Sequence, residues 1–253
     1  MSKLPKQHRF IDVSDYGRPI SRFIANTIKE TRLTPIHVTI GFIISGIIGI
    51  GCILVNYYWA AAFFLIFKSI LDGADGELAR LKNTPSYTGR YFDSVSDIIL
   101  NILILMAIWM ITDGSLLLTI LAFIGIQLQG TLYNYYYTIL RNRFNGDTTS
   151  RIFEDEVPIA MKGEKQKNVD IFFKLYKMLY GKFDEIIYAL DRNASKGKVL
   201  PKWFMTAVST FGLGFQLLII SVMLVVNLKD YIIPFFIGYS AMIFVFIGVR
   251  KLL

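Results

Sequence analysis

The stretch DGADGELARLKNTPSYTGRYFDSVSD, residues 72 to 97, separates two apolar runs, WAAAFFLIFKSIL before it and IILNILILMAIWMI after it. It contains four aspartates: Asp72, Asp75, Asp93 and Asp97. An ionised carboxylate at the edge of hydrocarbon is unfavourable unless a cation or a hydrogen-bond donor compensates its charge. The stretch therefore predicts a polar site at the point where two membrane helices meet.

The composition is typical of a membrane protein. The 253 residues are 54% hydrophobic and 18% charged, and the mean hydropathy is +0.48. A helix needs about 20 apolar residues to cross a bilayer core, and lipid allows only helices or closed barrels. We therefore expect an all-α integral membrane protein with six transmembrane helices, at residues 35–56, 58–78, 94–112, 114–138, 203–227 and 231–249.

Lysine and arginine indicate the orientation. Of the 27 basic residues, 25 lie in the first 34 residues, the 79–93 turn, the 139–202 segment and the C-terminal RKLL; the others are Lys68 and Lys229. Because positive loops stay in the cytoplasm, we expect both ends and the aspartate stretch there, in a bacterial inner membrane or an equivalent one. This topology and anionic lipid account for the net charge of +8, and no soluble basic module predicts nucleic-acid binding.

Four regions follow from this topology. Residues 1–34 form a cytoplasmic segment with an interfacial helix, 35–138 the first four spans with the aspartate stretch, 139–202 a cytoplasmic loop, and 203–253 the last two spans. Apolar and basic residues alternate at helical spacing within 15–32 and 169–190, which predicts amphipathic helices. A cytoplasmic helical hairpin packed against the spans is an equally good interpretation of residues 169–190.

The aspartates are spaced so that each pair shares a helix face. Asp72 and Asp75 are three residues apart, and the small residues Gly76 and Ala79 continue their face. On the next helix Gly89, Asp93 and Asp97 follow one another at intervals of four. The connection between the two helices is short, so we expect antiparallel neighbours whose acidic faces meet.

Four neighbouring carboxylates would repel one another by several kcal/mol even at an effective dielectric constant of about 20. Divalent cations remove this repulsion, and an all-oxygen site without His or Cys suits Mg²⁺, Mn²⁺ or Ca²⁺ better than Zn²⁺. Two such ions about 3.5–4 Å apart would clamp a phosphoryl group during displacement. Arg80 and Arg90 would offer positive charge to the oxygens of a bulky phosphate ester.

These residues and their spacing resemble the complete signature of the CDP-alcohol phosphotransferases. The matching positions are Asp72, Asp75, Gly76, Ala79, Arg80, Gly89, Asp93 and Asp97. The sequence LTPIHVT at 33–39 also resembles the Pro-Asn-x-x-Thr stretch of many members, with Ile36 in place of the asparagine and Thr39 as a candidate nucleotide-binding residue.

The resemblance implies a reaction in which a CDP-linked alcohol is cleaved, its phosphoalcohol is transferred to a hydroxyl, and CMP is released. It implies that Asp72, Asp75 and Asp93 bind metal, and that Asp97 completes a second metal site and accepts the proton of the attacking hydroxyl. The contacts it implies for the nucleotide and its diphosphate are Gly76, Ala79, Arg80 and Gly89. It also implies a homodimer.

Other basic residues near the aspartates admit more than one role. Lys68 lies four residues before Asp72 on the same face, where it would neutralise a carboxylate, contact substrate or, as we expect, extend its amine to the interface. Positive-inside bias alone explains Arg90 equally well. Cationic side chains facing the site from Arg141, Arg143 or Lys202 would favour a phosphorylated acceptor.

We therefore expect a Mg²⁺- or Mn²⁺-dependent enzyme of phospholipid biosynthesis, with CDP-diacylglycerol as donor and a small polar alcohol as acceptor. The alternative within the family is CDP-ethanolamine or CDP-choline with a lipid alcohol. A membrane prenyltransferase would have two acidic motifs far apart in sequence. An ion transporter would need polar residues through the depth of the membrane, and the other spans contain few.

Overall fold

The computed structural model describes residues 4–146 and 154–253, and every regular element in these two ranges is helical. Residues 147–153 of the predicted cytoplasmic loop lie outside the described residues. The α-helices are α1 (Arg18–Ile28), α2 (Pro35–Leu54), α3 (Tyr58–Leu81), α4 (Tyr87–Met110), α5 (Leu116–Arg143), α6 (Gln166–Leu190), α7 (Lys202–Val208), α8 (Leu213–Val225), α9 (Ile232–Tyr239) and α10 (Met242–Leu252).

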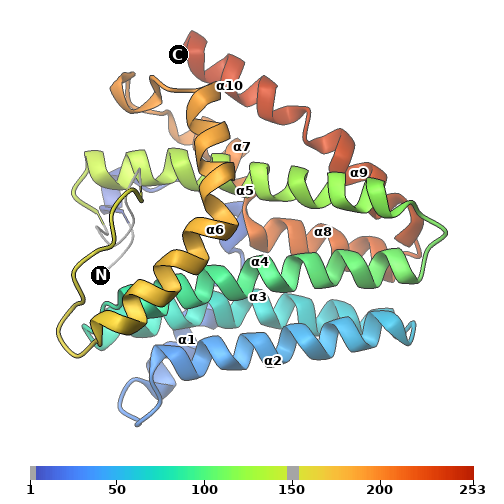
Figure 1. The fold of residues 1–253 in the computed structure, drawn as a ribbon, viewed down its shortest axis with the longest axis horizontal. Coiled ribbons are helices and arrows are strands. Elements are labelled where there is room, and N and C mark those ends of the chain that lie inside the picture. Colours follow the sequence, from blue (N-terminus) through green and yellow to red (C-terminus); the bar gives the residue numbers. More distant parts are fainter. Residues whose placement is uncertain (1–3, 147–153) are drawn as a thin grey trace.

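The long helices form a bundle. Helices α2, α3, α4, α5 and α8 run side by side along the long axis of the molecule, and α6 crosses this bundle obliquely (Figure 1). Helix α1 packs against α3, and α9 packs against α5. A core between α3, α4, α5, α8 and α9 is formed by apolar side chains that include Leu65, Ile104, Ile126, Leu217 and Phe236. The bundle core therefore excludes water from the middle of the predicted membrane region.

Several helical stretches of the described chain are long and apolar enough to cross a bilayer. Four of these stretches are candidate spans on their own. A fifth span is present if two consecutive helices, bent by 54° relative to each other, cross the membrane together. These stretches are Pro35–Leu54, Tyr87–Met110, Leu116–Arg143 and Lys229–Leu252, with Lys202–Phe211 and Leu213–Val225 as the bent pair. The protein is thus a multi-pass membrane protein that is helical throughout its described regular elements. The predicted span at residues 58–78, which lies in α3, stays a prediction because charged residues interrupt its apolar sequence.

The turns that end several helices have a common feature. An asparagine in the left-handed region, with φ between 48° and 61°, follows α2, α3, α5 and α8. The next amide donates a hydrogen bond to a carbonyl five residues earlier, which is the Schellman arrangement. These turns end the helices sharply, and after the one that follows α3 the next helix, α4, begins at the same end of the bundle and runs back beside α3 (Figure 1). The asparagines are Asn56, Asn83, Asn145 and Asn227.

The two predicted amphipathic segments are helical, and both pack against the bundle. In α1, Ser21 and Ala25 are buried, and the Ser21 hydroxyl donates to the Ile70 carbonyl at 2.7 Å. In α6, buried Val169 and Phe173 pack in a cluster with Tyr91 of α4. Residues 169–190 therefore pack against the bundle as expected, but they form part of one helix, α6, and not a hairpin. An interfacial position for either helix stays a prediction.

The N-terminus of α4 is fixed by two caps. Ser86 accepts a hydrogen bond from the Gly89 amide at 2.8 Å, as an N-cap residue does. The Glu164 carboxylate accepts from the Ser86 hydroxyl at 2.8 Å and from the amides of Tyr87 and Thr88 at 3.1 and 2.7 Å. The helix consequently begins before the predicted span at residue 94, and Asp93 and Asp97 lie within it.

The caps also affect the ionisation of Glu164. Burial opposes its charged form, but hydrogen bonds from Thr88, Ser86 and Met161 outweigh burial and hold the pKa of Glu164 below its ordinary value of 4.5. A negative charge at a helix N-terminus is also favoured by the helix dipole. Because this pKa is lower in the folded state than in the unfolded state, the cap stabilises the fold above pH 4.5 and this stabilisation is lost as the pH falls through the folded value.

We predict that Glu164→Gln destabilises the protein by about 1 kcal/mol at pH 7, the usual size of a lost cap. The measurement is the thermal midpoint of the detergent-solubilised variant and wild type between pH 7 and pH 4. The difference between the two midpoints should shrink below pH 4.5, because the carboxylate of the unfolded wild-type chain takes up protons there. The exposed variant Glu30→Gln, in the turn after α1, is the control, and a difference at Glu164 that does not change with pH would contradict this assignment.

Candidate active site

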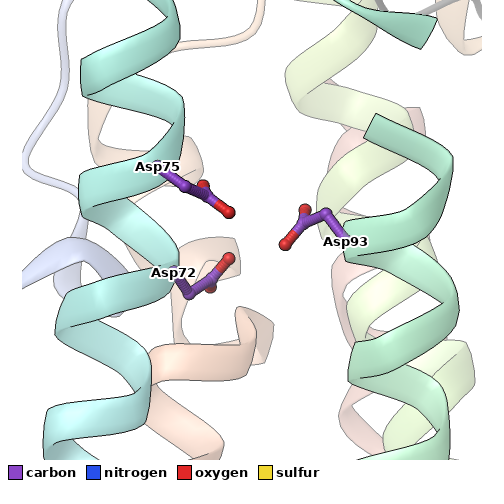
Figure 2. Close-up of side chains that lie close together, drawn as sticks. All are labelled: Asp72, Asp75 and Asp93. Atoms are coloured by element: carbon purple, nitrogen blue, oxygen red, sulfur yellow. The ribbon is translucent and has the colours of Figure 1, made fainter. Parts of the chain in front are cut away.

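Three of the four predicted aspartates meet between α3 and α4. Asp72 and Asp75 extend from α3 toward Asp93 on α4 (Figure 2). One carboxylate oxygen from each lies within 4.8 Å of the other two. The spacing of three residues on α3 places both acids on the face that looks toward α4, as the sequence predicts. The result is a group of three carboxylates with their oxygens directed at a common point.

The residues of this group fit a hard divalent cation. Asp75 is buried, Asp72 and Asp93 are half-buried, and one Asp93 oxygen, Oδ1, is buried without a hydrogen-bond partner. An unpartnered carboxylate oxygen inside a protein is unfavourable and indicates a cation or an ordered water. The three carboxylates are oxygen donors of the kind that Mg²⁺ and Mn²⁺ prefer.

Asp97 does not belong to this group. Its carboxylate forms an ion pair with the ammonium of Lys68, which comes from α3 and is fully buried. The Lys68 Nζ also lies 4.9 Å from the centre of the Phe42 ring of α2. The expectation that Lys68 extends to the membrane interface is therefore wrong, because α2 and α4 enclose this face of α3 and the amine finds its partner inside the bundle.

Thr39 contacts the acidic group directly. Its hydroxyl is buried and donates a hydrogen bond of 2.6 Å to Oδ2 of Asp75. The helix that carries it, α2, starts at Pro35 with a capping box between Thr34 and His37. The side chain of Ile36, at the position of the family asparagine, is 39% exposed. In this structure Thr39 orients a carboxylate of the site.

The predicted nucleotide contacts border the acidic group on α3. Arg80 crosses Gly76, and a Cβ on that glycine would lie 3.5 Å from Arg80 Nη1. The Arg80 guanidinium is 3.3 Å from the Glu77 carboxylate, and its Nε is buried without a partner. Ala79 is half-buried on the same helix. Gly89 lies on α4 and not on α3, and its amide donates a hydrogen bond to the Ser86 hydroxyl that caps this helix.

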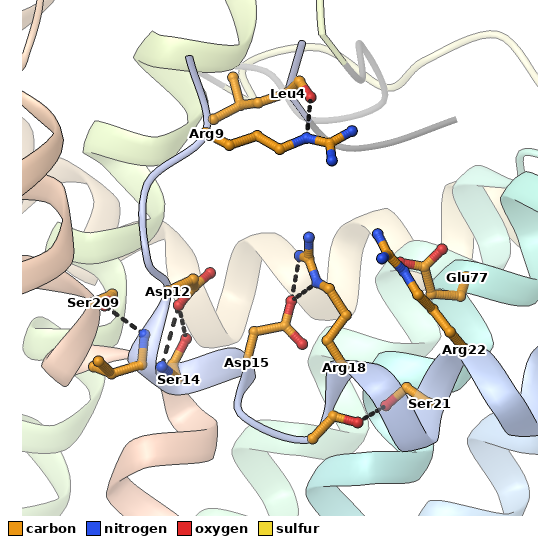
Figure 3. A network of polar contacts seen from close by, with 12 residues as sticks. Leu4, Arg9, Asp12, Ser14, Asp15, Arg18, Ser21, Arg22, Glu77 and Ser209 are labelled. Carbon is orange, nitrogen blue, oxygen red and sulfur yellow. Dashed lines mark hydrogen bonds and ion pairs between the residues drawn. The ribbon is translucent and has the colours of Figure 1, made fainter. Parts of the chain in front are cut away.

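Three residues near this end of α3 were missed by the sequence reasoning. Glu77 contacts both Arg80 and, at 3.5 Å, Arg22 of α1. Figure 3 shows Arg22 beside Glu77 and places Arg18, paired with Asp15, next to it on the same side of α1. The spacing of three between Glu77 and Arg80 is a recognisable helical pair, but the contributions of Arg18 and Arg22 depend on how α1 packs.

The other predicted cationic side chains have partners away from the aspartates. Arg90 forms an ion pair with Glu154 and lies against the Tyr91 ring. Arg143 donates to the Gly197 carbonyl at 2.6 Å. Arg141 donates to the Thr138 hydroxyl at 3.1 Å, and Lys202 is exposed at the start of α7. In this structure these residues are not gathered at the acidic group.

The fold and the site together define a multi-pass helical membrane protein with a carboxylate site between two of its helices. The family model for CDP-alcohol phosphatidyltransferase matches residues 23–153, which are 131 of the 253 residues and include the whole of α2 to α5. The chain therefore belongs to the CDP-alcohol phosphatidyltransferase family. It is a transferase of phosphate-containing groups that acts in phospholipid synthesis. A comparison with curated proteins gives no match.

We predict that Thr39→Val lowers the affinity for Mn²⁺ by about 10- to 100-fold, the usual effect of removing a hydrogen bond that orients a metal ligand. Valine preserves the shape of the side chain but cannot donate to Asp75. The measurement is a Mn²⁺ titration of the purified protein, with Thr39→Ser as the variant that should restore binding. Equal affinities of wild type and Thr39→Val would contradict an orienting role.

Proposed function

We propose that this protein transfers a phosphatidyl group from CDP-diacylglycerol to the hydroxyl of a small polar alcohol. The acceptor oxygen attacks the phosphorus distal to the cytidine, a new P–O bond forms, and the bond from that phosphorus to the bridging oxygen breaks. CMP leaves with the bridging oxygen and its electron pair. The observation that carries the proposal is the approach of three carboxylates at family-motif positions to within 4.8 Å of one another.

Asp72, Asp75 and Asp93 are proposed to hold Mg²⁺ or Mn²⁺. The buried, unpartnered Oδ1 of Asp93 supports this assignment. When bound, the metal neutralises charge on the diphosphate and on the departing phosphate. Thr39 keeps the Asp75 carboxylate in position through its 2.6 Å hydrogen bond.

Asp97 is proposed as the base that accepts the proton of the acceptor hydroxyl. It lies one turn beyond Asp93 on α4, so it is close to the acidic group without being part of it. A general base has to be ionised before the reaction, and the buried ammonium of Lys68 compensates the charge of its carboxylate.

The diphosphate of the donor is proposed to lie over Gly76 and Ala79, whose small side chains leave space beside the acids. Arg80 would bind its oxygens, because its guanidinium already lies next to Gly76. Arg80 shares Glu77 with Arg22, so the guanidinium is held by the protein before the substrate arrives. Gly89 is proposed to border the nucleotide from the start of α4, and its lack of a side chain also leaves room for the Ser86 hydroxyl, which would lie 3.1 Å from a Cβ at this position.

The active site is proposed to face the cytoplasm, where the positive-inside rule places the end of α3 and the start of α4. A homodimer is proposed from family membership. CDP-ethanolamine or CDP-choline with a lipid alcohol remains the runner-up for the substrates. An ion transporter is no longer a rival, because the family is one of transferases.

We predict that the purified protein releases CMP from CDP-diacylglycerol in the presence of Mg²⁺ or Mn²⁺ and a small polar alcohol. A panel of alcohols would be tested with this donor, and diacylglycerol would be tested with CDP-ethanolamine. EDTA should abolish CMP release. Release from CDP-ethanolamine alone would support the runner-up, and an absence of CMP with both donors would contradict the proposed function.

We predict that Asp97→Asn lowers the turnover number by about 10²- to 10⁴-fold, the usual contribution of a general base. The amide retains the size of the side chain but cannot accept the proton. Asp113→Asn, at an exposed turn between α4 and α5, makes the same change in charge away from the site and should retain activity. Near-normal turnover of a correctly folded Asp97→Asn protein would eliminate this base.

A further inference from the structure

Lys68 is a charged side chain that the family motif does not include. It lies on α3 four residues before Asp72, and none of its side chain is exposed to solvent. Its ammonium forms an ion pair with Asp97, 29 residues further along the chain on α4. The ring of Phe42 lies on another side of the amine, 4.9 Å away. The amine is thus enclosed by α2, α3 and α4.

An ammonium in such surroundings requires a counter-charge. Removing it from water is strongly unfavourable unless an anion and hydrogen bonds compensate. Asp97 provides this anion, so the charges of Lys68 and Asp97 cancel each other. The remaining acids, Asp72, Asp75 and Asp93, are the ones whose oxygens approach within 4.8 Å of one another.

The four aspartates are therefore divided into two units of different charge. Asp97 with Lys68 is neutral, and the group of three carries up to three negative charges. One divalent cation leaves that group with a single negative charge. A second divalent cation at Asp97 would have to approach the ammonium of Lys68, and like charges a few ångströms apart repel strongly in a buried site.

We propose that Lys68 takes the place of a second metal ion at Asp97, so that in the absence of substrate this chain binds one divalent cation, through Asp72, Asp75 and Asp93. The inference rests on the proposed metal site and departs from the two-metal arrangement expected from the sequence. Lys68 acts as a positioning residue, because its ion pair fixes the Asp97 carboxylate. The second cation of the site is supplied by the protein.

The test is the number of Mn²⁺ ions that the purified full-length protein binds without substrate. The protein is reconstituted in nanodiscs of zwitterionic lipid, and unbound Mn²⁺ is followed by its electron paramagnetic resonance signal. We expect one tightly bound ion per chain for wild type and two for Lys68→Met, because Asp97 then lacks its fixed cation. Lys68→Arg preserves the charge and should keep the number at one.

Two control variants separate this effect from a general change of charge or folding. Lys229→Met removes a lysine whose amine donates to the Ile111 carbonyl, and it should leave the number at one. Asp97→Asn added to Lys68→Met should return the number from two to one. The wild-type count needs no variant, so it tests the inference even where Lys68→Met does not fold.

The outcomes distinguish this inference from the proposed function. Two ions of similar affinity on wild type, or one ion on folded Lys68→Met, would overturn the inference and leave the proposed function in place. A wild-type protein that binds no Mn²⁺ would overturn both, because the three-carboxylate site would then not bind metal. One ion on wild type and two on Lys68→Met would support the inference.

Discussion

The structure depends on the compensation of negative charge between two mostly apolar helices. Carboxylates that face one another inside a bundle repel by several kcal/mol and also lose their hydration. The protein compensates part of this charge itself: Thr39 donates to Asp75, and Lys68 pairs with Asp97. The oxygen of Asp93 that has no partner is the part left for a ligand. The protein therefore leaves part of the negative charge of the site uncompensated. This remaining charge suits the site to a cation and, through the cation, to a phosphate ester.

Residues outside the family match hold one wall of this site. The match ends at residue 153, but Glu164 caps the start of α4 and Glu154 pairs with Arg90 one turn later. Tyr180 of α6 also donates to the Ser94 carbonyl, 3.0 Å away and adjacent to Asp93. The segment after the match thus fixes the rotation and position of α4. The position at which α6 crosses the bundle therefore allows it to hold α4 in place.

The sequence predicted the acidic group well because helical spacing alone decides which residues share a face. Asp72, Asp75 and Asp93 meet for that reason. The partner of Lys68 was not predictable in the same way, since a contact between helices depends on their separation and rotation. Lys68 lies near the end of a predicted span, so the sequence favoured an amine at the membrane interface. In the structure α2 and α4 enclose the side chain, and the amine lies inside the bundle.

The break between α7 and α8 is another feature that periodicity does not predict. The apolar pattern is continuous over residues 203–227, yet the two helices are bent by 54°. The glycines in the sequence FGLG were the available signal: a Cβ at Gly214 would lie 2.0 Å from the Ser14 carbonyl oxygen. The N-terminal segment packs into the space that these glycines leave. The bend is therefore a consequence of tertiary packing.

The surroundings of the acidic group differ between α2 and the end of α3, and this difference suits the proposed donor, CDP-diacylglycerol, which is both a lipid and a nucleotide. On α2, Ile40, Ile44 and Ile47 are 43%, 53% and 55% exposed, and they form an apolar stripe on the helix whose other face carries Thr39. At the end of α3, by contrast, Arg80 and Arg22 share Glu77. For the proposed donor, CDP-diacylglycerol, the charged head group would lie at the carboxylates beside these arginines, and an acyl chain would lie in the lipid along α2.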